Sequence, residues 1–246
     1  MFVFALYNLK GGVGKTASCV NLAHLAASDG YATLLWDLDP QGAAGFYFGA
    51  EAEGKSAVKK MMADQKGLSS LIQPSSYEHL DIIPADLSTR KLDLILDEKS
   101  SKKQLKKLLK EVGQEYDFVF IDCPPGFSNL ADNIFTAADA VLMPVIPTTL
   151  SLRTYDIVRD YLEDKEIGEE KLMCFFSMAD TRKTLHNEVM YSLSQDSRFF
   201  QYYIPQLSEV EKMGIHHAPV TAYAPNGTAA ACYAALWEEI KEGVLE

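Results

Sequence analysis

A glycine-rich stretch near the amino terminus has the residue types that bind a polyphosphate. It reads Lys10-Gly11-Gly12-Val13-Gly14-Lys15-Thr16 and is followed by Ala17. Its three glycines allow successive backbone N–H groups to turn inward on phosphate oxygens. Lys15 can then reach the β- and γ-phosphates, and the Thr16 hydroxyl can ligate Mg²⁺. We therefore predict that residues 10–17 bind a nucleotide, rather than forming a plain turn between a strand and a helix.

The loop differs in two ways from the common phosphate-binding pattern G-x-x-x-x-G-K-[ST]. Leu9 occupies the first glycine position, and Lys10 adds a second lysine five residues before Lys15. Lys10 cannot easily reach its own γ-phosphate alongside Lys15, but it could project outward to the nucleotide of another subunit. The alternative is an ordinary surface lysine.

Three aspartates close apolar runs and could take part in the chemistry of a bound nucleotide. Asp37 and Asp39 end one run, and Asp122 ends another. In parallel α/β sheets, ligands bind at the carboxyl ends of the strands, where all three would lie. We expect Asp122 to hold Mg²⁺ through water or Thr16, and Asp37 to support the ion through water. The alternatives are a turn former before Pro40 for Asp39 and a polar strand terminus for Asp122.

Short apolar runs alternate with helical patterns along the chain, which predicts the scaffold for these residues. This order favours an α/β fold, a mostly parallel twisted sheet with helices on both faces, in a single domain over 1–246. The predicted strands are 2–7, 32–36, 80–84, 118–121, 140–146, 172–177 and 202–205, and the predicted helices are 15–28, 88–112, 149–164, 184–194 and 226–242.

Composition limits the class of protein. The 246 residues are 48% hydrophobic, enough for a full core, and no run approaches the roughly 18–20 apolar residues of a membrane span. The four cysteines are isolated in sequence, as is typical of buried thiols in a cytosolic protein. Charge is uneven: residues 1–112 carry 14 Lys or Arg against 13 Asp or Glu, whereas residues 113–246 carry 9 against 21. This asymmetry restricts where a polyanion could dock.

Three stretches together resemble the deviant Walker A partition and positioning ATPases of the ParA/MinD family. They are the loop 10–16, the segment 36–42 (WDLDPQG) and the segment 120–126 (FIDCPPG). The resemblance is closest to short ParA proteins without an N-terminal helix-turn-helix domain, and 178–182 and 204–205 also fit it. It implies the P-loop ATPase fold, ATP and Mg²⁺ as cofactors, an ATP-dependent homodimer with two nucleotides in its interface, and slow turnover.

The resemblance also assigns roles to individual residues. Lys10 would act in trans on the partner's nucleotide, Lys15 would stabilise transferred charge, and Asp39 would orient the attacking water. The adenine would pack near Met178, Asp180 and Pro205.

Family members usually bind DNA nonspecifically as ATP dimers, and a ParB-like or cargo adaptor protein stimulates them. We accordingly expect a cytoplasmic switch, nucleoid-associated where it binds DNA, that positions a plasmid, a chromosome locus or a protein cargo. The segment 206–213 departs from the family's basic pattern because it has two acids and one base. A lysine stripe at helical spacing offers another DNA surface, its alternative being a solvated helix face. The stripe is Lys99, Lys102, Lys103, Lys106, Lys107 and Lys110.

Other functions fit the sequence less well. A membrane-bound role would need a basic amphipathic tail, but the tail 237–246 is acidic. An iron–sulfur reductase would need paired cysteines, and Cys123 has no evident second ligand. A metabolic ligase or synthetase of the same superfamily, or positioning on a protein scaffold instead of DNA, remain the alternatives.

Overall fold

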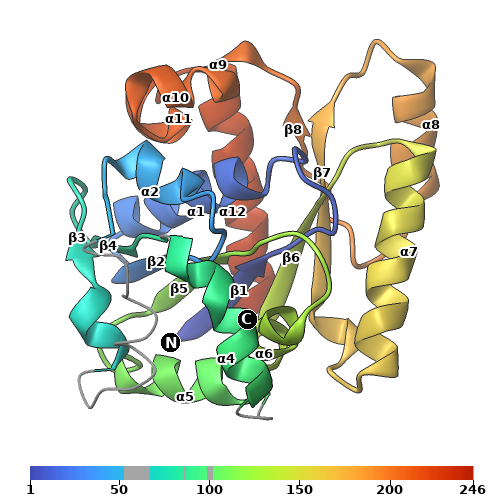
Figure 1. The fold of residues 1–246 in the computed structure, drawn as a ribbon. Coiled ribbons are helices and arrows are strands. Elements are labelled where there is room, and N and C mark those ends of the chain that lie inside the picture. Colours follow the sequence, from blue (N-terminus) through green and yellow to red (C-terminus); the bar gives the residue numbers. More distant parts are fainter. Residues whose placement is uncertain (53–66, 86, 99–101, 246) are drawn as a thin grey trace.

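A single twisted sheet forms the centre of the molecule (Figure 1). The computed structural model describes residues 1–52, 67–85, 87–98 and 102–245. In these residues eight strands lie in the order β3-β4-β2-β5-β1-β6-β7-β8, and every neighbouring pair is parallel except β3 with β4. The strands are β1 (Phe2–Leu6), β2 (Thr33–Asp37), β3 (Gln73–Pro74), β4 (Leu80–Ile83), β5 (Phe118–Asp122), β6 (Ala140–Val145), β7 (Leu172–Ala179) and β8 (Ile204–Pro205).

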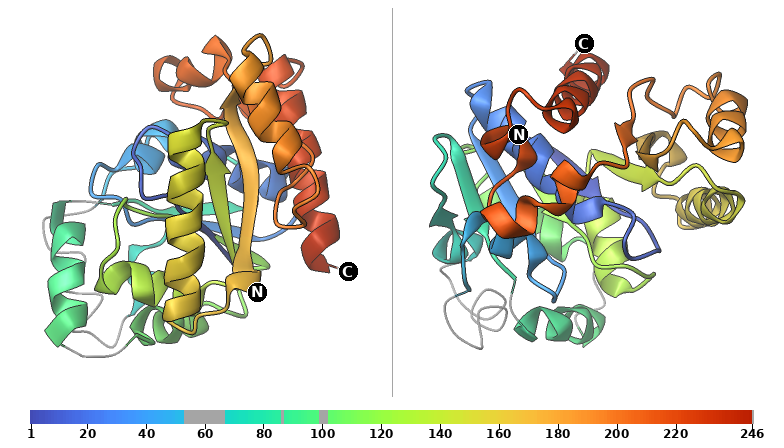
Figure 2. Two further views of the ribbon diagram at one scale, coloured as in Figure 1. Left: turned by 90° about the vertical axis from the view of Figure 1, so that its right-hand side faces the viewer. Right: turned by 90° about the horizontal axis from the view of Figure 1, so that it is seen from above.

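Helices cover both faces of the sheet, which confirms the predicted α/β class (Figures 1 and 2). The α-helices are α1 (Lys15–Ser28), α2 (Ala43–Phe48), α4 (Leu92–Glu98), α5 (Gln104–Glu111), α6 (Asn129–Ala137), α7 (Thr149–Asp164), α8 (Thr184–Ser192), α9 (Ser208–Glu211), α10 (Met213–His216), α11 (Val220–Tyr223) and α12 (Thr228–Leu245). Short 3₁₀ helices are η1 (Leu68–Leu71), η2 (Leu87–Lys91) and η3 (Glu169–Lys171). That the chain forms one domain over 1–246 stays a prediction.

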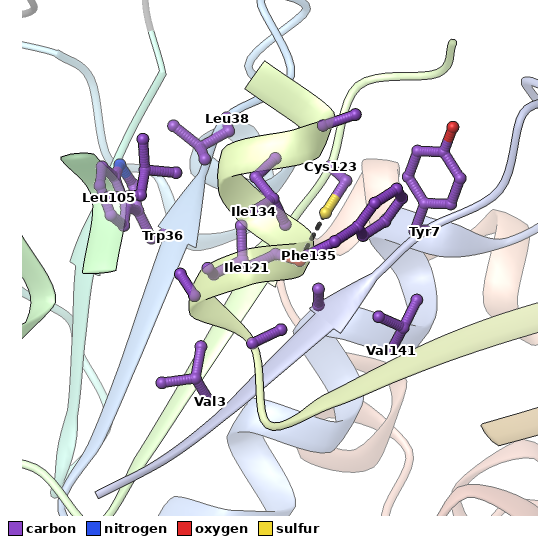
Figure 3. Packing of buried hydrophobic residues seen from close by; sticks show 14 of the residues in the cluster. Val3, Tyr7, Trp36, Leu38, Leu105, Ile121, Cys123, Ile134, Phe135 and Val141 are labelled. Carbon is purple, nitrogen blue, oxygen red and sulfur yellow. Dashed lines mark hydrogen bonds between the residues drawn. The ribbon is translucent and has the colours of Figure 1, made fainter. Parts of the chain in front are cut away.

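Strand β1 separates two cores because successive side chains of a strand point to opposite faces. Phe4 and Leu6 pack with α1 and α12, whereas Val3, Ala5 and Tyr7 pack with the helices of the other face. Figure 3 shows that second core, where side chains of α6 meet those of the sheet. Both faces of β1 are buried, which is why its sequence is continuously apolar instead of alternating.

Helices α1 and α7 match their predicted ranges, and seven of the strands lie within two or three residues of the predicted ones. The predicted helix 88–112 is wrong. Its described part contains η2, α4 and α5 as separate elements, and Lys103 precedes α5 with non-helical φ −110°. The first N–H of α5, on Gln104, donates to the Asn133 side chain at 3.0 Å, so an external acceptor caps this helix start.

The sequence reading missed α2, α6, the antiparallel edge strand β3 and the short helices α9 to α11. Helix α6 had a local signal, because the Ser128 hydroxyl accepts from the Ala131 N–H at the N-cap. No helix in the described residues is long and apolar enough to cross a membrane. Cys19, Cys123 and Cys174 are buried free thiols, as expected, and Cys232 is a half-buried one.

Candidate functional site

The glycine-rich loop joins the end of β1 to the start of α1, and Asn8 holds its first residues in place. The Asn8 side chain donates to the Pro144 carbonyl at 2.8 Å and accepts from the Lys10 N–H at 2.9 Å. Asn8 is buried, so the two bonds tie the loop firmly to the end of β6. Sequence reasoning did not identify Asn8.

Gly14 ends the loop in a conformation that suits glycine alone. Its φ is +91°, and a Cβ added there would lie 2.7 Å from the Ser177 Oγ of β7. The backbone of the loop therefore approaches β7 closely. Gly11 and Gly12, by contrast, face open space, with no atom within 4 Å of an added Cβ. A ligand can approach the backbone N–H groups there without a side chain in its way.

Lys15 is buried at the start of α1, with 6% of its surface exposed. Its ammonium donates to the Lys10 carbonyl at 3.0 Å, which bends the loop over the lysine. Burial lowers the pKa of Lys15, while the carboxylates of Asp122 and Asp39 oppose that shift. A cation so placed, at the positive end of a helix dipole, favours an anionic ligand.

Lys10 is half-buried, and desolvation lowers the pKa of its ammonium. Among the described residues its side chain has no ion pair, and it is not part of the cleft lining described below. Its role toward a second subunit stays a prediction.

Thr16 and Asp122 meet at the base of the site. The Thr16 hydroxyl donates to Asp122 Oδ2 at 2.7 Å. Asp122 is fully buried, and its other oxygen, Oδ1, has no hydrogen-bond partner among the described residues. Burial, followed by repulsion from Asp37, raises the pKa of Asp122 well above its usual range despite the opposing effects of Thr16 and Lys15. A buried carboxylate oxygen without a donor is costly unless a cation or water completes it.

Asp37 is engaged by backbone groups. Its Oδ1 accepts from the Asp39 N–H at 3.0 Å, and its Oδ2 accepts from the N–H groups of Ala44 and Gly45 at the start of α2. Burial raises its pKa, and the bonds to these N–H groups act against that rise. Asp37 thus fixes the turn that carries Asp39, and its predicted support of a metal stays a prediction.

Asp39 lies in a cleft of about 590 Å³ beside the loop. Its Oδ1 accepts from the Gln41 N–H at 3.0 Å, which holds the carboxylate at the rim of the turn. The lining consists of Gly11, Gly12, Gly14, Lys15, Thr16, Ala17, Asp39, Pro40, Gln41, Ala43, Tyr47, Arg90, Pro124 and Pro125. The structure therefore brings together the predicted phosphate loop, Asp39 and the segment after Asp122. Tyr47 and Arg90 belong to the cleft but were not identified from the sequence.

The residues of this cleft fit Mg²⁺ bound to a nucleoside polyphosphate. Open space faces the loop glycines, a buried lysine lies at a helix N-terminus, and Asp122 has an uncompensated oxygen next to the Thr16 hydroxyl. Oxygen donors of this kind suit Mg²⁺, which also retains several waters.

The three residues predicted for the adenine lie together at the ends of β7 and β8. Met178 has a positive φ of 54°, and Pro205 pairs with Ala179. Asp180 binds Arg182 through both carboxylate oxygens, which lowers the pKa of Asp180 to about 2. None of the three is part of the cleft lining among the described residues, although Ser177, one residue before Met178, contacts the loop at Gly14. Their contact with adenine stays a prediction.

The lysine stripe is interrupted in the structure. Lys106, Lys107 and Lys110 lie exposed on α5, whereas Lys102 precedes the helix and pairs with Asp132 at 3.4 Å. Lys103 is the N-cap residue, and Lys99 lies outside the described residues. Helix α5 sits at the end of the sheet where β1 begins, away from the loop that follows β1 (Figure 1). The exposed lysines of α5 and the phosphate loop therefore lie on separate parts of the surface.

Comparison with known proteins gives matches over nearly the whole chain. A family model described as an AAA domain matches residues 1–164. The sporulation initiation inhibitor protein Soj of Bacillus subtilis is 31% identical, with 97% of each chain covered. The chromosome-partitioning ATPase Soj of Treponema pallidum is 33% identical, with 95% of this chain and 94% of the relative covered.

Solved structures share the fold at lower identity. Apo McdA from Cyanothece matches with a TM-score of 0.84 at 19% identity, covering 99% of both chains. The cell division ATPase MinD of Pyrococcus furiosus matches with a TM-score of 0.80 at 18% identity, again over 99% of both. Cobyrinic acid a,c-diamide synthase from Mycobacterium smegmatis gives 0.81 at 22%, covering 100% of this chain and 97% of that one. Together with the three sequence motifs, the family model and the two Soj relatives show that this chain belongs to the ParA/MinD family of ATPases.

Proposed function

We propose that this chain is a Mg²⁺-dependent ATPase of ParA type, a dimerising switch that partitions or positions a plasmid, a chromosome locus or a protein cargo. The observation that carries the proposal is the cleft lined by the phosphate loop and Asp39, in which Thr16 of the lining donates to the buried Asp122. Relatives named for ATP-dependent partitioning support it, as do structures of McdA with ATP and of MinD from Pyrococcus horikoshii with Mg-ADP.

Each side chain has a defined task in phosphoryl transfer to water. The backbone N–H groups of 11–16 and the Lys15 ammonium hold the polyphosphate and stabilise the charge that develops on it. Thr16 and Asp122 would hold Mg²⁺, which when bound neutralises charge on the β- and γ-phosphates. Asp39, fixed by Asp37 and Gln41, would accept a hydrogen bond from the attacking water and orient it.

Turnover measurements test this assignment. With Mg²⁺ and ATP, Lys15→Ala should abolish nucleotide binding, whereas Asp39→Ala should still bind ATP but lose at least about 100-fold in phosphate release. Asp160→Ala, at an exposed acid outside the cleft, is the matched control and should release phosphate at the wild-type rate. Normal turnover by Asp39→Ala would remove Asp39 from the mechanism.

The dimer is the second part of the proposal. Lys10 is outside the cleft lining of its own subunit, which suits a lysine that reaches the nucleotide of a partner subunit. Each subunit would then complete the other's site, and a cation supplied in this way can accelerate phosphoryl transfer by roughly 10³–10⁵. A ParB-like or cargo adaptor protein would stimulate the slow basal reaction by favouring that arrangement.

Nonspecific DNA binding in the ATP dimer is the third part, through the exposed lysines of α5. Contacts between lysines and DNA phosphates weaken as salt is added. Each contact makes the logarithm of the binding constant fall by about 0.9 per unit rise in the logarithm of the salt concentration. Changing Lys106, Lys107 and Lys110 to Glu should abolish ATP-dependent retention of random duplex DNA. The same three residues changed to Arg keep the charge and should retain binding with the original slope. Undiminished retention by the Glu variant would leave α5 as a solvated helix and favour a protein scaffold.

The alternative of a metabolic ligase or synthetase rests on fold likeness to the cobyrinic acid a,c-diamide synthase. Assaying ATP-dependent consumption of a small acid separates the two functions. We expect no such product, and ATP turnover that depends only on water and a stimulating protein.

A further inference from the structure

Arg90 is the second cation of the cleft, and it comes from outside the phosphate loop. It lies in η2, the 3₁₀ helix that follows β4. It lines the same cleft as Lys15, Thr16 and Asp39. The family motifs of the sequence do not include it, and the mechanism above does not use it.

Arg90 shares the cleft with Asp39, and the residues after β4 pack on the Asp39 side of it. Pro84 and Ala85, which follow β4, lie against the turn that follows Asp39: a Cβ added at Gly42 would lie 3.4 Å from the Ala85 carbonyl, and one at Gly45 would lie 3.1 Å from the Pro84 Cβ. Pro84 and Ala85 are therefore held by the same turn that positions Asp39. This side of the cleft faces the reacting end of the polyphosphate, because Asp39 would orient the water there.

The guanidinium of Arg90 is available to a ligand. In the described part of the chain it makes no ion pair or hydrogen bond, and it is exposed. Asp39, the acid of the described cleft lining, accepts from the Gln41 N–H through Oδ1. An arginine presents a planar fork of donors that matches two oxygens of one phosphate, whereas a lysine presents a point charge.

We propose that Arg90 contacts the terminal phosphate of bound ATP from its own subunit, and so distinguishes ATP from ADP. This inference rests on the proposed nucleotide site. Lys15 and the loop N–H groups would bind the phosphates that both nucleotides share, and Arg90 would bind the oxygens that only ATP has. The contact would also hold the Asp39 turn against the nucleotide in the ATP state alone.

Equilibrium binding of ADP and of a non-hydrolysable ATP analogue, each with Mg²⁺, tests the proposal. Arg90→Ala should weaken binding of the analogue about 10-fold, the lower end for a charged hydrogen bond because the side chain is exposed, and change ADP binding by less than about 3-fold. Arg90→Lys should bind the ATP analogue with an affinity between those of the wild type and of Arg90→Ala. Lys91→Ala is the matched control, since Lys91 is the next cation of η2 and is not in the cleft lining.

The outcomes distinguish failure of the Arg90 contact from failure of the proposed nucleotide site. If Arg90→Ala weakens both nucleotides equally, or behaves like Lys91→Ala, the contact with the terminal phosphate is refuted. If the selective loss appears only at protein concentrations where the chain dimerises, Arg90 acts on a partner's nucleotide and the assignment within one subunit is wrong. Lys15→Ala tests the site itself: nucleotide binding that survives this change would overturn the proposed function, whatever Arg90 does.

Discussion

Replacing Asp122 by Asn should stabilise the protein in the absence of Mg²⁺ while removing its activity. In the part of the chain that the structure describes, the buried Asp122 carboxylate has one oxygen bonded to Thr16 and one with no partner. Lys15 and Thr16 favour the charged form, but burial and the repulsion of Asp37 outweigh them, so the pKa of Asp122 is raised. An uncharged amide keeps an acceptor for Thr16 and avoids the burial of a charge.

The sign of the pH effect follows from the direction of this shift. Above the ordinary pKa of 3.8, the unfolded chain has lost the Asp122 proton while the folded chain retains it. The folded state then binds more protons, so the stability of the wild type falls as the pH rises through that window. Asp122→Asn lacks this dependence. Its advantage should be small near pH 5 and reach about 1–3 kcal/mol near pH 8.

Thermal unfolding at several pH values measures this difference. For a chain of this size, about 1 kcal/mol corresponds to roughly 2–4 °C in Tm, so the variant should melt several degrees above the wild type at pH 8. Mg-ATP should raise the Tm of the wild type but have less effect on the variant, because ligand that binds only the folded state stabilises it. A variant that melts below the wild type at pH 8 without Mg²⁺ would refute the view that burial of the Asp122 carboxyl group destabilises the fold.

Two further predictions concern the loop and the core. Gly14→Ala should lower the free energy of unfolding by about 1–3 kcal/mol because of its left-handed backbone, and by more because of the clash with Ser177. It should also abolish nucleotide binding. In chemical denaturation, Gly30→Ala is the control for backbone strain, because Gly30 has a similar φ of +90° but faces open space. Burial lowers the pKa of His24 to about 4, so the unfolded state binds more protons between pH 4 and 6.5 and stability rises with pH there. His24→Gln should flatten that rise by about 2 kcal/mol, and an unchanged slope in pH-dependent urea denaturation would contradict the assignment.

The order of elements and the phosphate loop could be predicted because their signals are local. Alternation of buried strands with amphipathic helices predicts the parallel sheet, and glycines followed by Lys15-Thr16 predict the loop between β1 and α1. The break before α5 could not be predicted in this way, because it depends on Asn133, a residue of α6 that bonds the first N–H of α5.

The site residues that the sequence did not reveal also depend on contacts between separate segments of the chain. Asn8 holds the loop by bonding the Pro144 carbonyl of β6, more than a hundred residues away. Arg90 lines the cleft beyond Pro84 and Ala85, which pack on the turn at Gly42 and Gly45. Asp37 ends its strand as predicted, yet both its oxygens bond the backbone of the next turn, a local contact that strand periodicity does not reveal.

Mixing two inactive variants tests most directly whether each subunit completes the other's site. Consider a two-fold dimer of one Lys10→Ala subunit and one Asp39→Ala subunit. If Lys10 acts in trans, the site of the Lys10→Ala subunit has its own Asp39 and the partner's Lys10, so both groups are intact there. Random mixing in equal amounts should then restore about a quarter of the wild-type ATP turnover, since half of the dimers are mixed and each has one working site. If Lys10 serves its own subunit, both sites of the mixed dimer lack one group. A mixture no more active than either variant alone would contradict the account.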